Sequence, residues 1–140
     1  MRVQLKTNEL RFHIASEFDV KLAVLQAGKF ASAIDSNETV VQKIMTTVSE
    51  LAQNIVKYAG VGHIHVRKIC RSDIVVIEII AEDTGPGIRN IELAMGDNFS
   101  SGGTLGLGLP GVKRLMDEFH IESNAKDGTS VTAVKWIHDK

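Results

Sequence analysis

One apolar run, residues 74–80, constrains the fold of this chain more than any other stretch. It is rich in β-branched residues and bounded by turn-forming residues, so it predicts a buried strand that continues through Asp83 into Gly85-Pro86-Gly87. The glycines let the backbone bend sharply and approach a ligand closely at the end of that strand. The Asp83 carboxylate accepts hydrogen bonds and donates none, which suits a ligand with an exocyclic amine or a ring N–H. Considered alone, the same turn is equally typical of a solvated strand end.

The composition is that of one ordinary globular domain, residues 1–140. Hydrophobic residues make up 44% of the 140 residues and charged residues 24%, which suits a single core. The formal net charge of −1 predicts no general attraction to nucleic acid or to an acidic membrane. No run reaches the ~18 apolar residues of a membrane span and the N-terminus has no signal-like apolar core, so we expect a cytoplasmic protein. The single cysteine, Cys70, lies in an apolar strand-like run and is expected to be a small core residue.

Two helices are predicted in the first half of the chain. Ser16 or Asp19 can cap the first, which ends near residue 33, and an Asp-Ser-Asn sequence separates it from a second helix over residues 38–59. Apolar residues recur at helical spacing in both, so each helix should bury one stripe. The first stripe comprises Val20, Ala23, Val24, Ala27 and Phe30, and the second Val41, Ile44, Val48, Leu51, Ile55 and Tyr58.

Strands are predicted on both sides of these helices. Residues 3–14 contain alternating apolar and polar side chains, as do residues 63–69, which is typical of half-buried strands. A further helix is predicted over residues 108–119, after a loop rich in glycine and serine. Two strand-like runs, residues 121–123 and 129–137, close the chain around a Lys-Asp-Gly turn. This order of elements predicts an α+β fold: a two-layer α/β sandwich with a mixed, mainly antiparallel sheet and helices on one face.

Polar residues on the second predicted helix form a candidate site. Glu50 and Asn54 are four residues apart, so both lie on one face, beside the buried stripe rather than within it. A carboxylate can deprotonate a nucleophile, while an amide oxygen can hold a hard cation such as Mg²⁺. Lys57, one turn further on, could attract phosphate. The competing interpretation, a solvated polar face, is the more common one for such a pair considered alone.

A glycine-rich stretch, residues 100–108, forms another candidate site. It leads into the N-terminus of a predicted helix, where free N–H groups and the positive end of the helix dipole favour an anion. Residues 106–111 match G-x-G-x-x-G, but a Ser/Gly-rich loop stands where the Rossmann fold needs a strand, so we reject that fold. The sequence also lacks the G-K-[ST] of a P-loop.

Together and in this order, the three motifs resemble the boxes of the GHKL ATPases. This superfamily comprises gyrase-type ATPases, heat-shock 90 chaperones, sensor histidine kinases and MutL-type repair proteins. Residues 50–54 match the N box, Asp83-x-Gly85-x-Gly87 the G1 box, and residues 106–108 the G2 box. Nearly the whole chain is similar to the anti-sigma-factor-type serine/threonine protein kinases, and among them to the RsbT-type switch kinases of the bacterial stressosome. The resemblance implies the Bergerat ATP-binding fold.

The resemblance also implies a role for each matching residue. Glu50 would be the general base for the attacking hydroxyl, and Asn54 would hold Mg²⁺ against the phosphates of ATP. Asp83 would accept a hydrogen bond from the adenine amine, and Thr129 would contact the adenine side directly or through water. The ATP-binding set that follows is Asn54, Lys57, Asp83, Gly85, Gly87, Ile88, Gly102, Gly103, Thr104, Leu105, Gly106, Leu107, Gly108 and Thr129.

One departure from related sporulation-type kinases concerns the loop before residue 109. Those kinases carry a basic residue there, and residues 96–109 of this sequence contain none. Either Lys57 substitutes for it or the γ-phosphate is neutralised mainly by Mg²⁺, in which case turnover should be slow.

These implications predict a serine/threonine protein kinase that uses Mg-ATP to phosphorylate a STAS-domain scaffold or antagonist. The kinase would switch partners as a result and activate a PP2C-type phosphatase. Two alternatives remain open. The chain could be a non-catalytic, ATP-gated protein-binding switch, which the missing basic residue favours and Glu50 disfavours, or it could be an anti-sigma factor.

Overall fold

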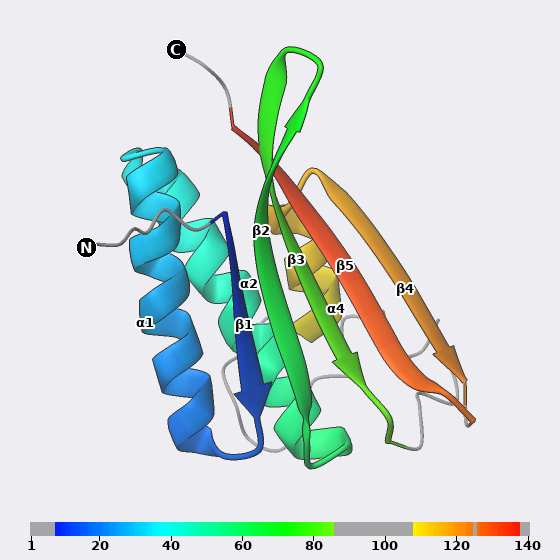
Figure 1. Ribbon diagram of the computed structural model, residues 1–140. Coiled ribbons are helices and arrows are strands. Elements are labelled where there is room, and N and C mark those ends of the chain that lie inside the picture. Colours follow the sequence, from blue (N-terminus) through cyan, green and yellow to red (C-terminus); the bar gives the residue numbers. More distant parts are fainter. Residues whose placement is uncertain (1–7, 86–107, 125, 138–140) are drawn as a thin grey trace.

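The computed structural model describes residues 8–85, 108–124 and 126–137. In these residues a layer of helices covers one face of a five-stranded sheet (Figure 1). The strand order is β1-β2-β3-β5-β4, and all four neighbouring pairs are antiparallel. The strands are β1 Glu9–Ile14, β2 Gly62–Arg71, β3 Ile74–Asp83, β4 Glu118–Asn124 and β5 Gly128–Ile137. The predicted α+β sandwich is therefore confirmed, but the described sheet is antiparallel throughout rather than mixed.

The two long helices begin at side-chain caps. Helix α1 spans Glu17–Ile34, and the Ser16 hydroxyl accepts a hydrogen bond from the Asp19 N–H at 3.2 Å, so Ser16 is the cap. Helix α2 spans Glu38–Tyr58, and the Asn37 side-chain oxygen accepts from the N–H groups of its first turn. Each cap satisfies backbone donors that the helix itself leaves unpaired. Both helices therefore lie close to where the sequence predicted them.

The third described helix is shorter than predicted. Helix α4 spans Gly108–Leu115, whereas the sequence pattern extended it to Phe119. Phe119 instead lies in β4, opposite Ala133 of β5, and the Asp117 N–H donates to the Val134 carbonyl at 2.9 Å. A short apolar run fits helical and strand spacing equally well, and here pairing with β5 decides the outcome.

The core lies between the sheet and the helices. Alternate side chains of β2 and β3 point towards α2, as the two-residue period of a strand requires. On α2, every member of the predicted stripe is buried except Tyr58, whose exposed fraction is 39%. Ile55 packs close to Gly62 at the start of β2, and Tyr58 is the last residue of α2. The fully buried large residues include Ile44, Val48, Leu51, Ile64, Val66, Ile77 and Ile79.

Cys70 is exposed, so its prediction as a core residue is wrong. It lies near the C-terminal end of β2, where burial fades towards the β2–β3 turn. Figure 1 shows this hairpin extending beyond the helices. The alternation of the strand continues there, but no described helix covers it.

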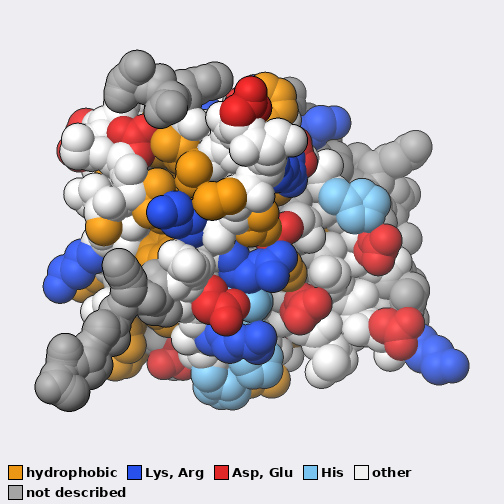
Figure 2. Space-filling model, turned by 45° about the horizontal axis from the view of Figure 1, so that its top comes forward, with side chains coloured by type: hydrophobic (Ala, Val, Ile, Leu, Met, Phe, Trp, Pro, Cys, Tyr) orange, Lys and Arg blue, Asp and Glu red, His pale blue; other side chains and the backbone are white. Residues whose placement is uncertain are grey.

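The other face of the sheet carries paired charges. His65 of β2 lies 2.6 Å from Glu9 of β1, and Arg67 of β2 bonds to Glu78 of β3. Figure 2 shows acidic, basic and histidine side chains close together on this side of the molecule. Such cross-strand pairs are typical of a solvated sheet face. Within the described part of the chain, α1, α2 and α4 do not combine the length and hydropathy that a helix needs to cross a bilayer.

Candidate functional site

Helix α2 carries three of the predicted site residues, each in a different environment. Glu50 is buried, with an exposed fraction of 9%, Asn54 is half-buried and Lys57 is exposed. The sequence analysis placed Glu50 beside the buried stripe rather than within a buried region. That prediction is wrong about burial, because α4 packs against this side of α2 and covers the side chain. A solvated polar face does not describe this carboxylate. The Lys57 ammonium lies 5.2 Å from the ring centre of Tyr58.

Glu50 contacts the first residue of α4. Its Oε1 atom accepts a hydrogen bond from the Gly108 N–H at 3.1 Å. Gly108 has a φ of +68°, which is a conformation that glycine adopts without strain. The carboxylate therefore caps the positive end of α4, where negative charge is stabilised. This contact joins two of the motifs, which are 58 residues apart in the sequence.

Asp83 ends β3 and shapes the turn that follows. Its Oδ1 atom accepts from the Gly85 N–H at 2.9 Å, which holds the turn closed. A Cβ atom on Gly85 would lie 2.7 Å from the Cβ of Ala59 and 2.9 Å from its Cα. Those distances are shorter than side chains tolerate, so only glycine lets this turn pack on the C-terminal cap of α2. The strand end is thereby fixed against the helix that carries Glu50 and Asn54.

Gly62 brings the start of β2 onto the same part of α2. A Cβ atom there would lie 2.9 Å from Ile55 Cγ2 and 3.1 Å from Asp83 Cβ. Asp83 thus lies close to the last turns of α2, next to the turn that carries Asn54. The sequence analysis did not identify Gly62 as part of the site. Its close approach depends on the register that pairs it with Asp83, which the sequence does not reveal.

Thr129 lies opposite Asp83 in the pairing of β3 with β5. Its hydroxyl is 2.7 Å from the hydroxyl of Ser123 on β4. Gly128, just before it, has a φ of +88°, and a side chain there would overlap the Asp83 carbonyl oxygen. Ser123 is a neighbour that the sequence analysis missed, since only the β4–β5 register places it beside Thr129.

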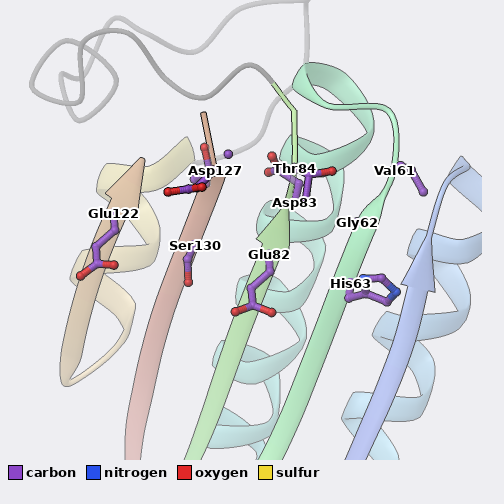
Figure 3. A pocket seen from close by; sticks show the side chains of 11 residues that line it. Val61, Gly62, His63, Glu82, Asp83, Thr84, Glu122, Asp127 and Ser130 are labelled. Carbon is purple, nitrogen blue, oxygen red and sulfur yellow. The ribbon is translucent and has the colours of Figure 1, made fainter. Parts of the chain in front are cut away.

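A hollow of about 430 Å³ opens at this end of the sheet (Figure 3). Asp83, Thr84 and Thr129 line one part of it, whereas Glu50, Asn54 and Gly108 do not line it. Figure 3 shows Glu82 and Glu122 on the uncovered face of the sheet, away from the helices. The hollow therefore shares only its strand-end part with the predicted site.

The remaining predicted site residues lie outside the described part of the chain. These are Gly87, Ile88, Gly102, Gly103, Thr104, Leu105, Gly106 and Leu107. The structure brings Glu50 to Gly108, and it brings Asp83 and Gly85 to the C-terminal end of α2, with Thr129 opposite Asp83. The candidate site is thus arranged along one side of a single helix.

The described side chains fit a magnesium ion held mainly by a substrate. They contain no group of three or more His, Cys, Asp or Glu residues that could hold a metal. Mg²⁺ is usually bound through one or two protein oxygens together with phosphates and water, rather than by an all-protein cage. The amide oxygen of Asn54, one turn from Glu50, is a suitable hard ligand.

Comparisons with known proteins identify the family of this chain. A sequence profile of the family described as "Histidine kinase-, DNA gyrase B-, and HSP90-like ATPase" matches residues 39–138. The chain is 46% identical to the serine/threonine-protein kinase RsbT of Bacillus subtilis (strain 168) over 125 residues, which are 89% of this chain and 93% of that protein. It is 32% identical to the anti-sigma F factor of Clostridium novyi (strain NT) over 111 residues, covering 76% and 78% of the two chains.

Among solved structures, the fold resembles that of the mycobacterial sensor histidine kinase MprB. The TM-score is 0.51 at 24% identity, over 69% of this chain and 71% of that one. This likeness supports the fold alone, whereas the family profile and the relatives cover most of the chain. The chain therefore belongs to the GHKL ATPases and, within them, to the RsbT-type serine/threonine protein kinases.

Proposed function

We propose that this kinase uses Mg-ATP to phosphorylate a serine or threonine of a STAS-domain partner. The observation that carries the proposal is the placement of two carboxylates along α2. Glu50 lies buried at the N-terminus of α4, and Asp83 lies near the last turns of α2. One helix thus positions both a candidate base and a candidate acceptor for adenine, and positioning is much of what phosphoryl transfer requires.

Asp83 would recognise the adenine ring of the nucleotide. A carboxylate that accepts and does not donate selects a ring with an exocyclic amine over a ring with a carbonyl at that position. One of its oxygens already accepts from the Gly85 N–H, which fixes the orientation of the group. Thr129, opposite Asp83, would contact the same side of the ring.

Glu50 and Asn54 would act on the other end of the nucleotide. When bound, Mg²⁺ neutralises charge on the phosphates and orients them. Asn54 would supply an amide oxygen to that ion, and the half-buried position of Asn54 keeps the side chain in place. Glu50 would take the proton from the attacking hydroxyl. Lys57, an exposed residue in the last turn of α2, would attract the phosphates from solvent.

The partners follow from the kind of relative. By their names, one similar protein is a serine/threonine-protein kinase and another is an anti-sigma factor. We propose that the chain binds its STAS-domain substrate, is released when that partner is phosphorylated, and then activates a PP2C-type phosphatase. Residues 96–109 contain no basic residue for the γ-phosphate, so we expect transfer to be slow. Slow transfer suits such a switch.

Transfer of label from γ-³²P-ATP to a purified STAS-domain partner, with Mg²⁺, tests this proposal. We expect phosphoserine or phosphothreonine on the partner, and Asp83→Asn should lose both ATP binding and transfer. Glu82→Gln is the matched control, since Glu82 is the preceding residue on the uncovered face of β3. It should leave binding and transfer close to wild type. Equal losses in the two variants would contradict the role of Asp83.

The missing basic residue also favours a second candidate, an ATP-gated binding switch without transfer. The same experiment separates the two candidates. If the wild-type protein binds ATP and changes its affinity for the partner, but no partner is ever labelled, the binding switch replaces the kinase mechanism.

A further inference from the structure

We propose that Glu50 has a second role, as the anion that occupies the N-terminus of α4 until the phosphates of a nucleotide displace it. This inference rests on the proposed binding of ATP and on the expectation from the sequence that its phosphates bind at the start of α4. The second role differs from that of a general base, because it makes Glu50 a competitor of ATP for the N-terminus of α4.

The contact that carries the inference is the bond between Glu50 and α4. Glu50 Oε1 accepts from the Gly108 N–H at 3.1 Å, and Gly108 is the first residue of the helix. The side chain is buried, with an exposed fraction of 9%, so bulk water screens its charge poorly. A carboxylate in this position is the simplest mimic of a phosphate oxygen at a helix N-terminus.

A phosphate that used the same N–H group would have to replace the carboxylate. One N–H cannot donate a full hydrogen bond to two anions, and two anions at the same buried site repel each other. The first turn of α4 contains no acidic side chain of its own. Glu50, from another helix, supplies the negative charge that accepts from this helix end.

The consequence is a link between binding and chemistry. While Glu50 accepts from Gly108, one of its oxygens is committed to the helix rather than to a hydroxyl. When phosphate takes over that donor, the oxygen becomes available to the attacking hydroxyl of the partner. The base would therefore be released by the phosphates themselves, at a cost to nucleotide affinity.

Calorimetric titration with ATP and with adenosine, both without Mg²⁺, tests the inference in wild type, Glu50→Gln and Glu50→Ala. Removing the competing charge should tighten ATP binding by about 5- to 30-fold, the range expected for a partly buried charge at a helix terminus. Adenosine lacks phosphates and should bind all three proteins equally. Glu38→Gln, which neutralises an exposed glutamate in the first turn of α2, is the matched control and should leave both affinities unchanged.

Amide exchange provides a second readout that does not depend on affinity. Without nucleotide, the Gly108 amide should exchange faster in Glu50→Ala than in wild type, and saturating ATP should abolish the difference. ATP affinities within twofold of wild type in both Glu50 variants would overturn the inference, as would weaker binding. Those results leave the kinase proposal intact, whereas a wild-type protein that binds no ATP overturns both.

Discussion

Helices α1 and α2 lie side by side on the same face of the sheet, but they differ in the size of the apolar side chains that they bury. α1 buries small residues, Ala23, Ala27, Gly28 and Ala31, and presents large apolar ones to solvent. Phe18, Leu22 and Leu25 have exposed fractions of 71%, 43% and 59%. α2 buries large aliphatic residues, places Glu50 against the start of α4, and packs its last turns against the end of β3.

The difference shows which helix organises the site. Small residues let α1 approach α2 closely, as where Gly28 lies against the side chain of Met45. α2 therefore packs against α1 on one side and against the sheet on another, and its edge residues are kept in fixed positions. The ATPase family profile begins at residue 39, within α2, and leaves α1 outside. The predictions below test this contrast from the largest expected effect to the smallest.

Shortening a buried residue of α2 should have the largest effect on stability. Ile44→Ala removes a side chain that is fully buried between helix and sheet, and should lower the free energy of unfolding by about 2–5 kcal/mol. Leu25→Ala on the exposed face of α1 should change it by no more than about 0.5 kcal/mol. Urea unfolding of both variants measures the difference. Similar losses would show that α1 is covered in solution.

Adding a methyl group at Gly85 should loosen the junction between β3 and α2. The new Cβ would lie 2.7 Å from that of Ala59, so Gly85→Ala should cost about 1–3 kcal/mol through overpacking and weaken ATP binding. The double variant Gly85→Ala with Ala59→Gly removes the Cβ–Cβ overlap and should recover part of both losses. Thermal unfolding and ATP titration check this, and a double variant no better than the single one would rule out the contact as the cause.

Removing the side-chain cap of α2 should lower the free energy of unfolding more than removing that of α1, and both losses should be smaller than those above. Asn37 accepts from two N–H groups of α2, at 2.8 and 3.3 Å, whereas Ser16 accepts from one of α1 at 3.2 Å. Asn37→Ala should therefore cost about 1 kcal/mol or more, and Ser16→Ala less. Urea unfolding midpoints show which variant is less stable. A larger loss for Ser16→Ala than for Asn37→Ala would contradict the claim that α2 contributes more to stability than α1.

The smallest effect is expected on the uncovered sheet face, away from both helices. Hydrogen bonds from Arg71 and then from Trp136 lower the pKa of Glu118 below its ordinary value of 4.5. A carboxyl group with a lowered pKa stabilises the fold above its ordinary pKa, and that contribution is lost as pH falls through the pKa of the folded state. Glu118→Gln should cost less than about 1 kcal/mol at pH 7, and less still under acid conditions. Unfolding measured against pH in both proteins checks the direction.

Local patterns predicted most of the fold, because they reflect local physics. The start of α1 at Ser16 or Asp19, the break before α2, the stripe on α2 and the strand that ends at Asp83 were all visible as spacing and residue type. Where short-range rules compete, prediction failed. The chain leaves α4 at Leu115 because Phe119 pairs with β5, and Cys70 is exposed because β2 outruns the helices.

The candidate site was predicted as residue types but not as contacts. Glu50, Asn54 and Asp83 stood out by their motifs, yet the bond from Gly108 to Glu50 joins elements 58 residues apart. The packing of Gly62 and Gly85 on α2 likewise depends on strand register and on how the sheet meets the helix. Those long-range relations follow from the assembled core, which no local pattern encodes.

The most direct test of the account compares binding and transfer in Glu50→Ala. With saturating Mg-ATP and the STAS-domain partner, a single-turnover experiment measures transfer, and titration on the same sample measures ATP binding. Loss of a general base should slow transfer by about 10²- to 10⁴-fold, while ATP binding is kept or tightened. Transfer within a few-fold of wild type, at equal ATP occupancy, would show that α2 does not supply the base.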